Sequence, residues 1–324
     1  PKLQAAGWDT SPHSLNAQKV FSDGRIFAAR RRRRQGPAEA GGLVLAVHAP
    51  VQHRGGRGKG RRRRCRDRSC ARCDQAGVVP AVVRAATIIN RIVAGTISGY
   101  FSETIINLEG IQKADRSAVL GSTTMSQSEQ FTEHPETGDT VVATTFTVSD
   151  PLRKPLHPEV AARIRAARNL GMRLLRAPRL GSQQINDPDG TVFAAEADEG
   201  ALDKRLRLYQ SVLRELEARG VGFVQVKQLA SEFAVRANVQ EPWFQSLKRA
   251  ADVHEVNAVI RAVAEWADGD SVAAHIGYGL DYFCTGDEGK SAGAASVFDV
   301  ASRAWLTATY GTNFMTMSQL AAMV

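Results

Sequence analysis

The feature that most limits the fold of this chain is a regular alternation of helix-type and strand-type segments from residue 82 to residue 323. Apolar residues at helical spacing alternate with short runs rich in Val, Ile, Thr and aromatic residues. This alternation favours a parallel sheet whose two faces are covered by helices. The predicted helices span residues 82–94, 105–116, 158–170, 202–219, 227–237, 244–251, 256–266, 271–279, 302–310 and 318–323; the predicted strands span residues 97–101, 140–148, 172–175, 222–226, 281–285 and 313–317.

The first 80 residues have a different composition. They hold 18 Lys and Arg against five Asp and Glu, whereas residues 81–324 hold 24 basic and 28 acidic residues. Arginine runs at 30–34 and 61–64 stand among Gly, Ala and Pro, and no aromatic residue occurs between Phe27 and Tyr100. Such a segment buries too little apolar surface to offset its chain entropy, so we expect it to be largely disordered.

Three interpretations of this basic segment stay open. Its arginine runs can neutralise phosphates, which is typical of a nucleic-acid-binding arm. It can also be a solvated tail without a selected role. The third interpretation is an out-of-frame translation of residues 28–80, because an excess of Arg, Ala, Gly and Pro together with missing aromatic residues is what a frame error in a GC-rich gene produces.

Cysteine usage and hydropathy give an expectation for the compartment. Four cysteines in 324 residues, with no recognisable signal peptide, do not indicate a disulfide framework. No apolar run is long enough to span a membrane. The sequence therefore predicts a cytoplasmic protein without a membrane partner.

The acidic segment from Gly269 to Gly289 carries the clearest chemical pattern. Asp270 opens a predicted Ala-rich helix that Gly279 ends, and a short apolar strand then leads to Asp287. A helix start and the exit of the next strand usually lie at one edge of an α/β sheet, so the two carboxylates are expected to converge. Two converging carboxylates repel each other unless a cation lies between them. The pattern is therefore compatible with a divalent metal that activates water.

This segment resembles the C-terminal acidic half of the PIN-domain nucleases, in which an acid, an Ala-rich helix, a glycine, an apolar strand and Thr-x-Asp follow in order. Asp270 and Thr285-Gly-Asp287 stand at the matching positions, seventeen residues apart. Upstream, the segment 99–109 resembles the strand-to-helix passage that presents the second acid of the family. That match assigns the role to Glu109, with Glu103 as a weaker candidate. The family's first acid, which ends its first strand, has no clear counterpart.

The resemblance covers residues 82–323, with 115–200 matching only loosely as an insertion. It implies a three-layer α/β/α fold and a metal-dependent ribonuclease in which Glu109, Asp270 and Asp287 hold Mg²⁺ or Mn²⁺ and serve as the catalytic residues. The alternative is a non-catalytic PIN-like module that binds nucleic acid or protein, because the first acid is missing. The resemblance is also compatible with a protein inhibitor of the antitoxin type and with a homo-oligomer. No residue of the sequence points to a particular inhibitor or oligomer interface.

Each candidate acid also has an ordinary structural interpretation. Asp270 can cap a helix, Asp287 can be a turn acid, and Glu109 and Glu103 can be solvated helix residues. Asp268 is expected just outside the helix as a turn residue.

Neighbouring polar residues have weaker functional interpretations. Asp281 is expected at a strand start, and His275 is interpreted as a packed core histidine. Thr285 can orient a ligand or a water through its hydroxyl. Arg116 and Arg303 can contact a phosphate, although single arginines do not define a site.

Overall fold

The computed structural model describes residues 26–31, 43–48, 81–133, 140–177, 185–196, 200–289 and 295–324. The arginine runs beyond Arg31 and three of the four cysteines lie outside these residues, and so does most of the segment predicted to be disordered. Within that segment, two strands are described: β1 (Ile26–Arg31) and β2 (Leu43–His48).

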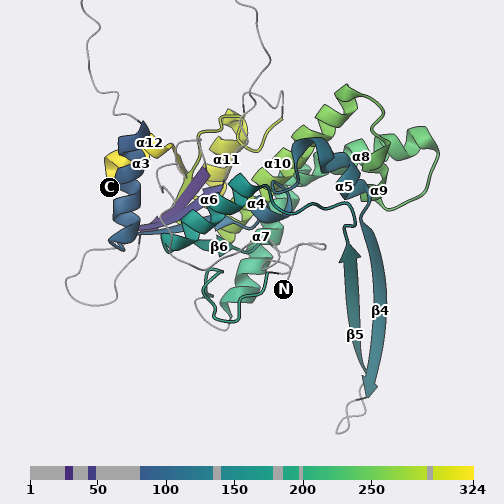
Figure 1. Cartoon of the computed structure of the whole chain (residues 1–324), viewed down its shortest axis with the longest axis horizontal. Helices are drawn as coiled ribbons and strands as arrows, with labels where there is room; N and C mark the ends of the chain where they lie inside the picture. The colour runs from purple at the N-terminus through teal and green to yellow at the C-terminus, as the bar shows by residue number, and fades with distance from the viewer. Residues whose placement is uncertain are drawn as a thin grey trace, which may run out of the picture.

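The remaining described residues form a mixed helical and strand structure with short, mainly parallel strands (Figure 1). Its elements in chain order are α3 (Ala81–Val93), β3 (Ile97–Ser102), α4 (Thr104–Asn107), the 3₁₀ turn η1 (Lys113–Asp115), α5 (Arg116–Gly121), β4 (Thr124–Glu133), β5 (Thr140–Ser149), α6 (Pro158–Asn169), β6 (Arg173–Leu175), α7 (Ala201–Ala218), α8 (Phe223–Ala237), α9 (Trp243–Ser246), η2 (Leu247–Arg249), α10 (Val253–Gly277), β7 (Tyr282–Cys284), α11 (Val300–Tyr310), β8 (Asn313–Met315) and α12 (Met317–Met323).

The main sheet has the strand order β6-β3-β1-β2-β7-β8. β2 runs parallel to β3 and to β7, β6 runs parallel to β3, and β8 runs parallel to β7; β1 is antiparallel to its partners. The carboxyl ends of five strands therefore meet at one edge. Loops at this edge are where α/β proteins usually place their functional side chains.

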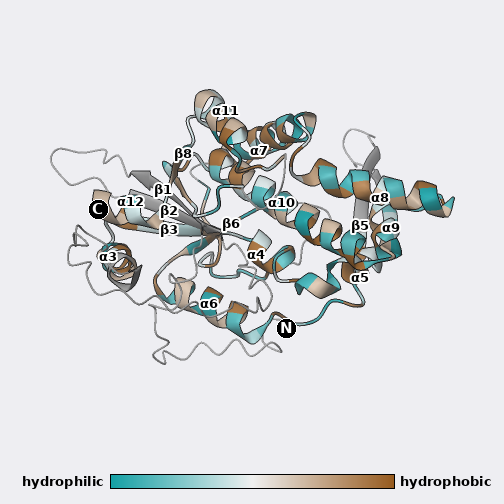
Figure 2. Cartoon of the chain, turned by 90° about the horizontal axis from the view of Figure 1, so that it is seen from above, coloured by the Kyte–Doolittle hydropathy of each residue, from teal (hydrophilic) through white to brown (hydrophobic). Residues whose placement is uncertain are grey.

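Alternate residues of β3, β6 and β7 point to two separate apolar cores, as the period of two in a strand requires. Phe101, Leu174 and Cys284 enter a core formed with α3, α6 and α12. Leu175 and Phe283 enter a second core formed with α7, α10 and α11. In Figure 2, α7 and α11 lie on one side of the strands, and α3 and α6 lie on the other. The strands β3, β6 and β7 therefore contribute buried side chains to both cores.

A third apolar cluster lies beside the sheet and contains only helices and turns. Its buried side chains come from α5, α8 and the first half of α10, and include Val119, Val226, Phe233, Val263 and Trp266. The second half of α10 enters the core on the sheet. A helix of 25 residues is about 37 Å long, so α10 connects the helical cluster to the sheet.

The hairpin β4–β5 extends away from the rest of the protein (Figure 1). Its strands pair antiparallel over ten residues each, from Thr124↔Ser149 to Glu133↔Thr140. All residues from 124 to 131 are exposed, and the side chain of Phe131 is 68% exposed. The segment 115–200 was expected to be an insertion. Within it, the hairpin extends away from the protein, whereas α6 packs in the main core and β6 pairs with β3 in the main sheet.

Most predicted elements are found within one or two residues of their expected bounds. Outside α10, three regions differ from the prediction. Residues 222–226 are not a strand, because Val226, Ala230 and Phe233 form one buried helical stripe and α8 begins at Phe223. The helix expected at 105–116 is divided into α4, η1 and α5. β4 was not predicted, since its polar sequence gives little strand signal.

Among the described residues, no helix combines the length and the apolar character that crossing a membrane requires.

Candidate functional site

The loop after β7 carries Asp287 and is held by short-range contacts. The Asp287 N–H donates to the Thr285 hydroxyl at 2.9 Å, and the Asp287 carboxylate accepts from the Gly289 N–H at 2.8 Å. Arg303 of α11 donates to the carbonyl oxygens of Asp287 and Phe298. Thr285 therefore shapes the backbone of this loop, and Arg303 fixes it to α11. The half-buried Asp287 carboxyl group is presented at the carboxyl edge of the sheet.

Asp270 does not open a helix, contrary to the sequence prediction. The helices expected at 256–266 and 271–279 are one continuous helix, α10, whose N-cap is Asp252. Gly269 lies inside it and serves as a packing contact: a Cβ added there would lie 3.6 Å from Leu216 Cδ1 of α7. This is an ordinary van der Waals distance, so the site has room for a Cβ, and the glycine within the helix costs about 1 kcal/mol relative to alanine.

The continuity of α10 sends Asp268 and Asp270 to different sides of one helix. Successive residues of a helix turn by about 100°, so the directions of these two side chains differ by about 160°. Burial raises the pKa of Asp268, and the charge of Asp287 acts in the same direction. Asp268 is a buried helical residue, and its expected place in a turn outside the helix is wrong. Asp270 is buried as well, at 1% exposure, on another side of α10.

Glu265 adds a third carboxylate to this group. It lies one turn before Asp268 on α10, is 6% exposed, and accepts a hydrogen bond from the Val297 N–H at 2.8 Å. Burial raises the pKa of Glu265 to about 8, and the charges of Asp268 and Asp287 act in the same direction. Burial and the charge of Asp287 raise the pKa of Asp268 well above its ordinary value. The group formed by Glu265, Asp268 and Asp287 is called the acidic cluster below.

Glu109 is related to the acidic cluster through Arg116, on which both Glu109 and Asp268 act electrostatically. Burial lowers the pKa of the Arg116 guanidinium, while the charges of Glu109 and Asp268 oppose this shift. Arg116 is 1% exposed and donates to the Ile260 carbonyl oxygen of α10 at 2.8 Å. Lys113 is also near: burial and Arg116 lower its pKa, and Glu109 raises it. Glu109 and Asp268 therefore both interact electrostatically with the buried Arg116.

The other residues singled out in the sequence have structural roles. Glu103 is buried rather than solvated, and its carboxylate accepts from the Ala177 N–H at 2.8 Å, joining the end of β3 to the end of β6. His275 is a packed core histidine, as predicted: its ring meets Phe283 edge-on at 5.3 Å, and burial lowers its pKa to about 3. Asp281 lies just before β7, close to its predicted position.

Sequence reasoning missed Glu265 and set Asp268 aside. A signal for both was available, because Glu265, Asp268 and Val272 follow the spacing of one helix face if no break is assumed at Gly269. Taken alone, the sequence Asp268-Gly-Asp270 is typical of a turn. It therefore predicts a break between two helices instead of one continuous helix.

The donor set of this site suits a hard cation in its chemistry. Carboxylate oxygens are the ligands that Mg²⁺ and Mn²⁺ prefer, and buried carboxylates with raised pKa values are stabilised by a nearby cation. Within the described part of the chain, however, no three His, Cys, Asp or Glu side chains form a group that could hold a metal ion. We therefore assign no coordination geometry to the acidic cluster or to Glu109.

Comparisons of this chain with protein-family models, with characterised proteins and with solved structures find no match.

Proposed function

We propose that this protein is a metal-dependent ribonuclease with a PIN-like three-layer fold, and that Glu109, Asp268 and Asp287 are its metal-binding acids. The parallel strands β6-β3-β2-β7-β8, with helical cores on both sides, support this fold. The acids lie after β3, on α10 and after β7, which is the order of the family pattern. Asp268 is preferred to Asp270 because the charge of Asp287 acts on the pKa of Asp268.

The observation that carries the proposal is the burial of Glu265 and Asp268 on α10. Glu265 accepts from the Val297 N–H, and Arg303 joins the next residue, Phe298, to Asp287 through their carbonyl oxygens. Asp287 raises the pKa values of both Asp268 and Glu265, although burying several carboxylates together is costly for a stable fold. Perturbed carboxylates at the carboxyl edge of a parallel sheet are typical of a functional site. A bound Mg²⁺ or Mn²⁺ supplies charge neutralisation and an activated water for phosphodiester hydrolysis.

The residues of the chain have separate roles in this proposal. Asp268 and Asp287 form the cation-binding pair, and Glu109 adds a carboxylate from the segment after β3. Lys113 is half-buried next to Glu109 and can meet a phosphate oxygen of the RNA. Arg116 is too deeply buried to meet a substrate, so it orients Glu109 and Asp268 instead. RNA as the substrate and the cytoplasm as the compartment stay predictions from the sequence.

Single amide substitutions test these roles. Asp268→Asn and Asp287→Asn are each expected to reduce Mn²⁺-dependent RNA cleavage by at least about a hundredfold. Asp270→Asn is expected to keep cleavage, because that carboxylate faces elsewhere on α10. Glu129→Gln, on the exposed hairpin, is the matched control. If Asp270→Asn is inactive and Asp268→Asn is active, Asp270 is the metal-binding acid, as the family resemblance implies. If the Asp268→Asn/Asp287→Asn double variant is fully active, neither Asp268 nor Asp287 binds the metal.

The second candidate is a non-catalytic PIN-like module that binds nucleic acid or protein. The guanidinium of Arg116 favours it, since a built-in cation already interacts with Glu109 and Asp268. The end of β2 favours it too, because that strand ends at His48 without a carboxylate. Isothermal titration with Mn²⁺ distinguishes the two functions: the nuclease requires a site that Asp287→Asn removes, and the module shows no such site.

A further inference from the structure

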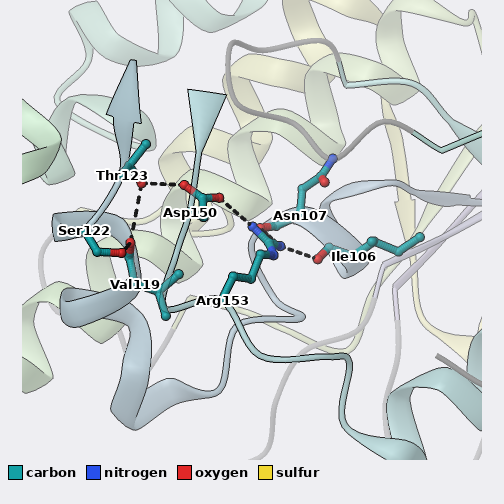
Figure 3. Close-up of polar contacts among 7 residues, drawn as sticks. All are labelled: Ile106, Asn107, Val119, Ser122, Thr123, Asp150 and Arg153. Atoms are coloured by element: carbon teal, nitrogen blue, oxygen red, sulfur yellow. Dashed lines mark hydrogen bonds and ion pairs between the residues drawn. The ribbon is translucent and has the colours of Figure 1, made fainter. Parts of the chain in front are cut away.

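The β4–β5 hairpin is fixed to the rest of the protein at its base (Figure 3). Asp150, the residue after β5, accepts a hydrogen bond at 2.6 Å from the hydroxyl of Thr123, the residue before β4. The other oxygen of Asp150 pairs with the Arg153 guanidinium at 3.3 Å. Arg153 in turn donates to the carbonyl oxygens of Ile106 and Asn107 at the end of α4. These contacts give both strands of the hairpin a defined direction away from the core.

The two strands of the hairpin form a sheet of their own. Among the described residues, this sheet contains β4 and β5 and no third strand. Its register is uninterrupted over ten pairs, so each outer edge presents a long, regular row of backbone N–H and C=O groups. The main sheet, by contrast, ends in β6 and β8, which have three residues each. Short edge strands limit unwanted strand pairing, and the hairpin lacks this protection.

The outer edge of β5 is suited to pairing with another strand. Eight of its ten residues are Val, Thr or Phe, which favour strands. Lysine, proline and bulges are common protections of an exposed edge, and β5 contains none of them. A hairpin of two strands is at best marginally stable alone, and a third strand stabilises it. The edge of β5 is therefore a suitable surface for strand addition.

The charges of the hairpin restrict the partner that this edge can accept. No Lys or Arg occurs from residue 117 to residue 152, and β4 carries Glu129 and Glu133. Such a ribbon repels phosphates, so a nucleic acid does not fit it. A basic strand is attracted to the acids of β4 and finds no opposite charge on β5. An uncharged strand of equal length fits the β5 edge, and the β5 strand of a second copy of this chain meets both conditions.

We propose that β5 pairs antiparallel with β5 of a second copy of this chain, so that two hairpins form one four-stranded sheet. A two-fold axis near the middle of β5 and perpendicular to the sheet relates the two copies. The β4 strands are then the outer strands, and their acids are separated by three strand spacings. This separation of about 14 Å exceeds the Debye length of about 8 Å at physiological salt, so the repulsion between the acids is weak.

The shape of the protein leaves room for this dimer. A strand of ten residues is about 34 Å long, and antiparallel pairing puts the two protein bodies at opposite ends of the paired hairpins. The hairpin extends away from the remaining elements in Figure 1, so its strands are accessible along their length. The interface contains none of the acids assigned to the metal, and the proposal is therefore independent of the proposed function.

The oligomeric state of the full chain, measured by sedimentation velocity over a range of concentrations, tests the proposal. The wild-type protein is expected to be a dimer that dissociates on dilution. Thr145→Lys, near the middle of β5, places like charges near the two-fold axis and is expected to raise the dissociation constant of the dimer about tenfold or more. Ser128→Lys is the matched control, because Ser128 is paired with Thr145 in the hairpin and belongs to the outer strand. It is expected to dimerise as the wild-type protein does.

Charge complementation tests whether the partner is a second copy. Thr145→Glu alone is expected to dimerise as poorly as Thr145→Lys. An equimolar mixture of the two variants is expected to recover the dimer, since opposite charges then meet near the axis. Recovery requires two folded variants, so it also shows that the loss of the dimer is not a loss of the fold.

Three outcomes overturn the proposal: a wild-type chain that is monomeric at every concentration, a dimer that Thr145→Lys and Ser128→Lys weaken equally, and a mixture of the two charged variants that stays monomeric. Hydrogen exchange of the unmodified chain gives an independent measurement. About half of the β5 amides point away from β4, and these should exchange slowly in the dimer and rapidly after dilution. A monomer in which all β5 amides exchange slowly shows that another segment of the same chain occupies the edge, and this also overturns the proposal.

Discussion

The acid-bearing edge of the main sheet and the β4–β5 hairpin contain similar strand residues and have opposite surroundings. In the sheet, Phe283 and Cys284 of β7 enter two different apolar cores, and Asp287, three residues further on, is half-buried. In the hairpin, the residues from 124 to 131 are exposed. The hairpin is stabilised by the backbone pairing of β4 with β5 and, at its base, by the hydrogen bond from Thr123 to Asp150.

The difference shows that the burial of a strand residue, more than its strand propensity, decides how much it contributes to the free energy of unfolding. At the sheet edge, burial stabilises apolar groups and destabilises charged ones, so substitutions there should have large effects of both signs. In the hairpin, a side chain loses little water on folding, so effects should be small except at the base. Four predictions test this contrast, from the largest effect to the smallest.

The largest effect is expected from Glu265→Gln at high pH. The pKa of Glu265 is raised from 4.5 to about 8, so its contribution to stability is fully present below pH 4.5 and is lost as the pH rises through 8. The complete loss amounts to as much as about 5 kcal/mol. Gln keeps an acceptor for the Val297 N–H and carries no charge. Urea unfolding should therefore show a gain in stability for Glu265→Gln at pH 8 and little gain at pH 4.5.

The control for this prediction is Glu129→Gln, because Glu129 is an exposed carboxylate of the hairpin. It should follow the wild-type protein at both pH values. Equal losses of stability by the wild-type protein and Glu265→Gln between pH 4.5 and pH 8 would show that the buried carboxylate is not costly.

Phe283→Ala is expected to lower the free energy of unfolding by about 3 to 5 kcal/mol, because it leaves a cavity in a packed core. Phe283 is 2% exposed, and its ring contacts those of Phe298 and Phe314 at centroid distances of 5.5 and 5.6 Å. Thermal or urea unfolding measures the loss. A change below about 1 kcal/mol would mean that this side of the sheet is not covered as described.

Thr123→Val removes the 2.6 Å hydrogen bond to Asp150 with little change in volume. The expected loss is about 2 kcal/mol, since a hydrogen bond to a charged group is removed from a largely buried carboxylate. The effect should be local: hydrogen exchange should rise in the hairpin and its base before it rises in the main sheet. Uniform acceleration across the whole protein would contradict this.

Phe131→Ala should have the smallest effect, within about 0.5 kcal/mol of the wild-type stability. The side chain is 68% exposed on β4, so its removal leaves no cavity. Phe283→Ala is its counterpart, with the same substitution on a covered strand. A loss comparable to that of Phe283→Ala would show that the hairpin is covered in solution.

Much of the fold could be predicted from local patterns. The helix at residues 201–218 repeats apolar residues at helical spacing, and glycine follows it closely. The sequence Asp187-Pro-Asp-Gly190 is typical of a turn, and the Asp187 carboxylate accepts from the Val192 and Phe193 N–H groups. These features depend on residues close in sequence, so no tertiary contact is needed to recognise them. Asp287 and the strand before it belong to this class.

The remaining features depend on neighbours distant in sequence. β4 is polar and forms a strand because β5 pairs with it. Gly269 could end a helix or lie within one, and α10 continues through it with buried residues on both sides. Arg116, a charged residue without a motif, is buried and donates to the Ile260 carbonyl oxygen, and the charges of Glu109 and Asp268 act on it.

The sequence by itself indicated most helices and strands of residues 81–324 and the strand that precedes Asp287. Only the tertiary structure decided that Asp268 and Asp270 belong to one helix and are buried on different sides of it. The physical reason is the continuity of α10: once the helix passes through Gly269, a two-residue spacing turns the two carboxylates about 160° apart.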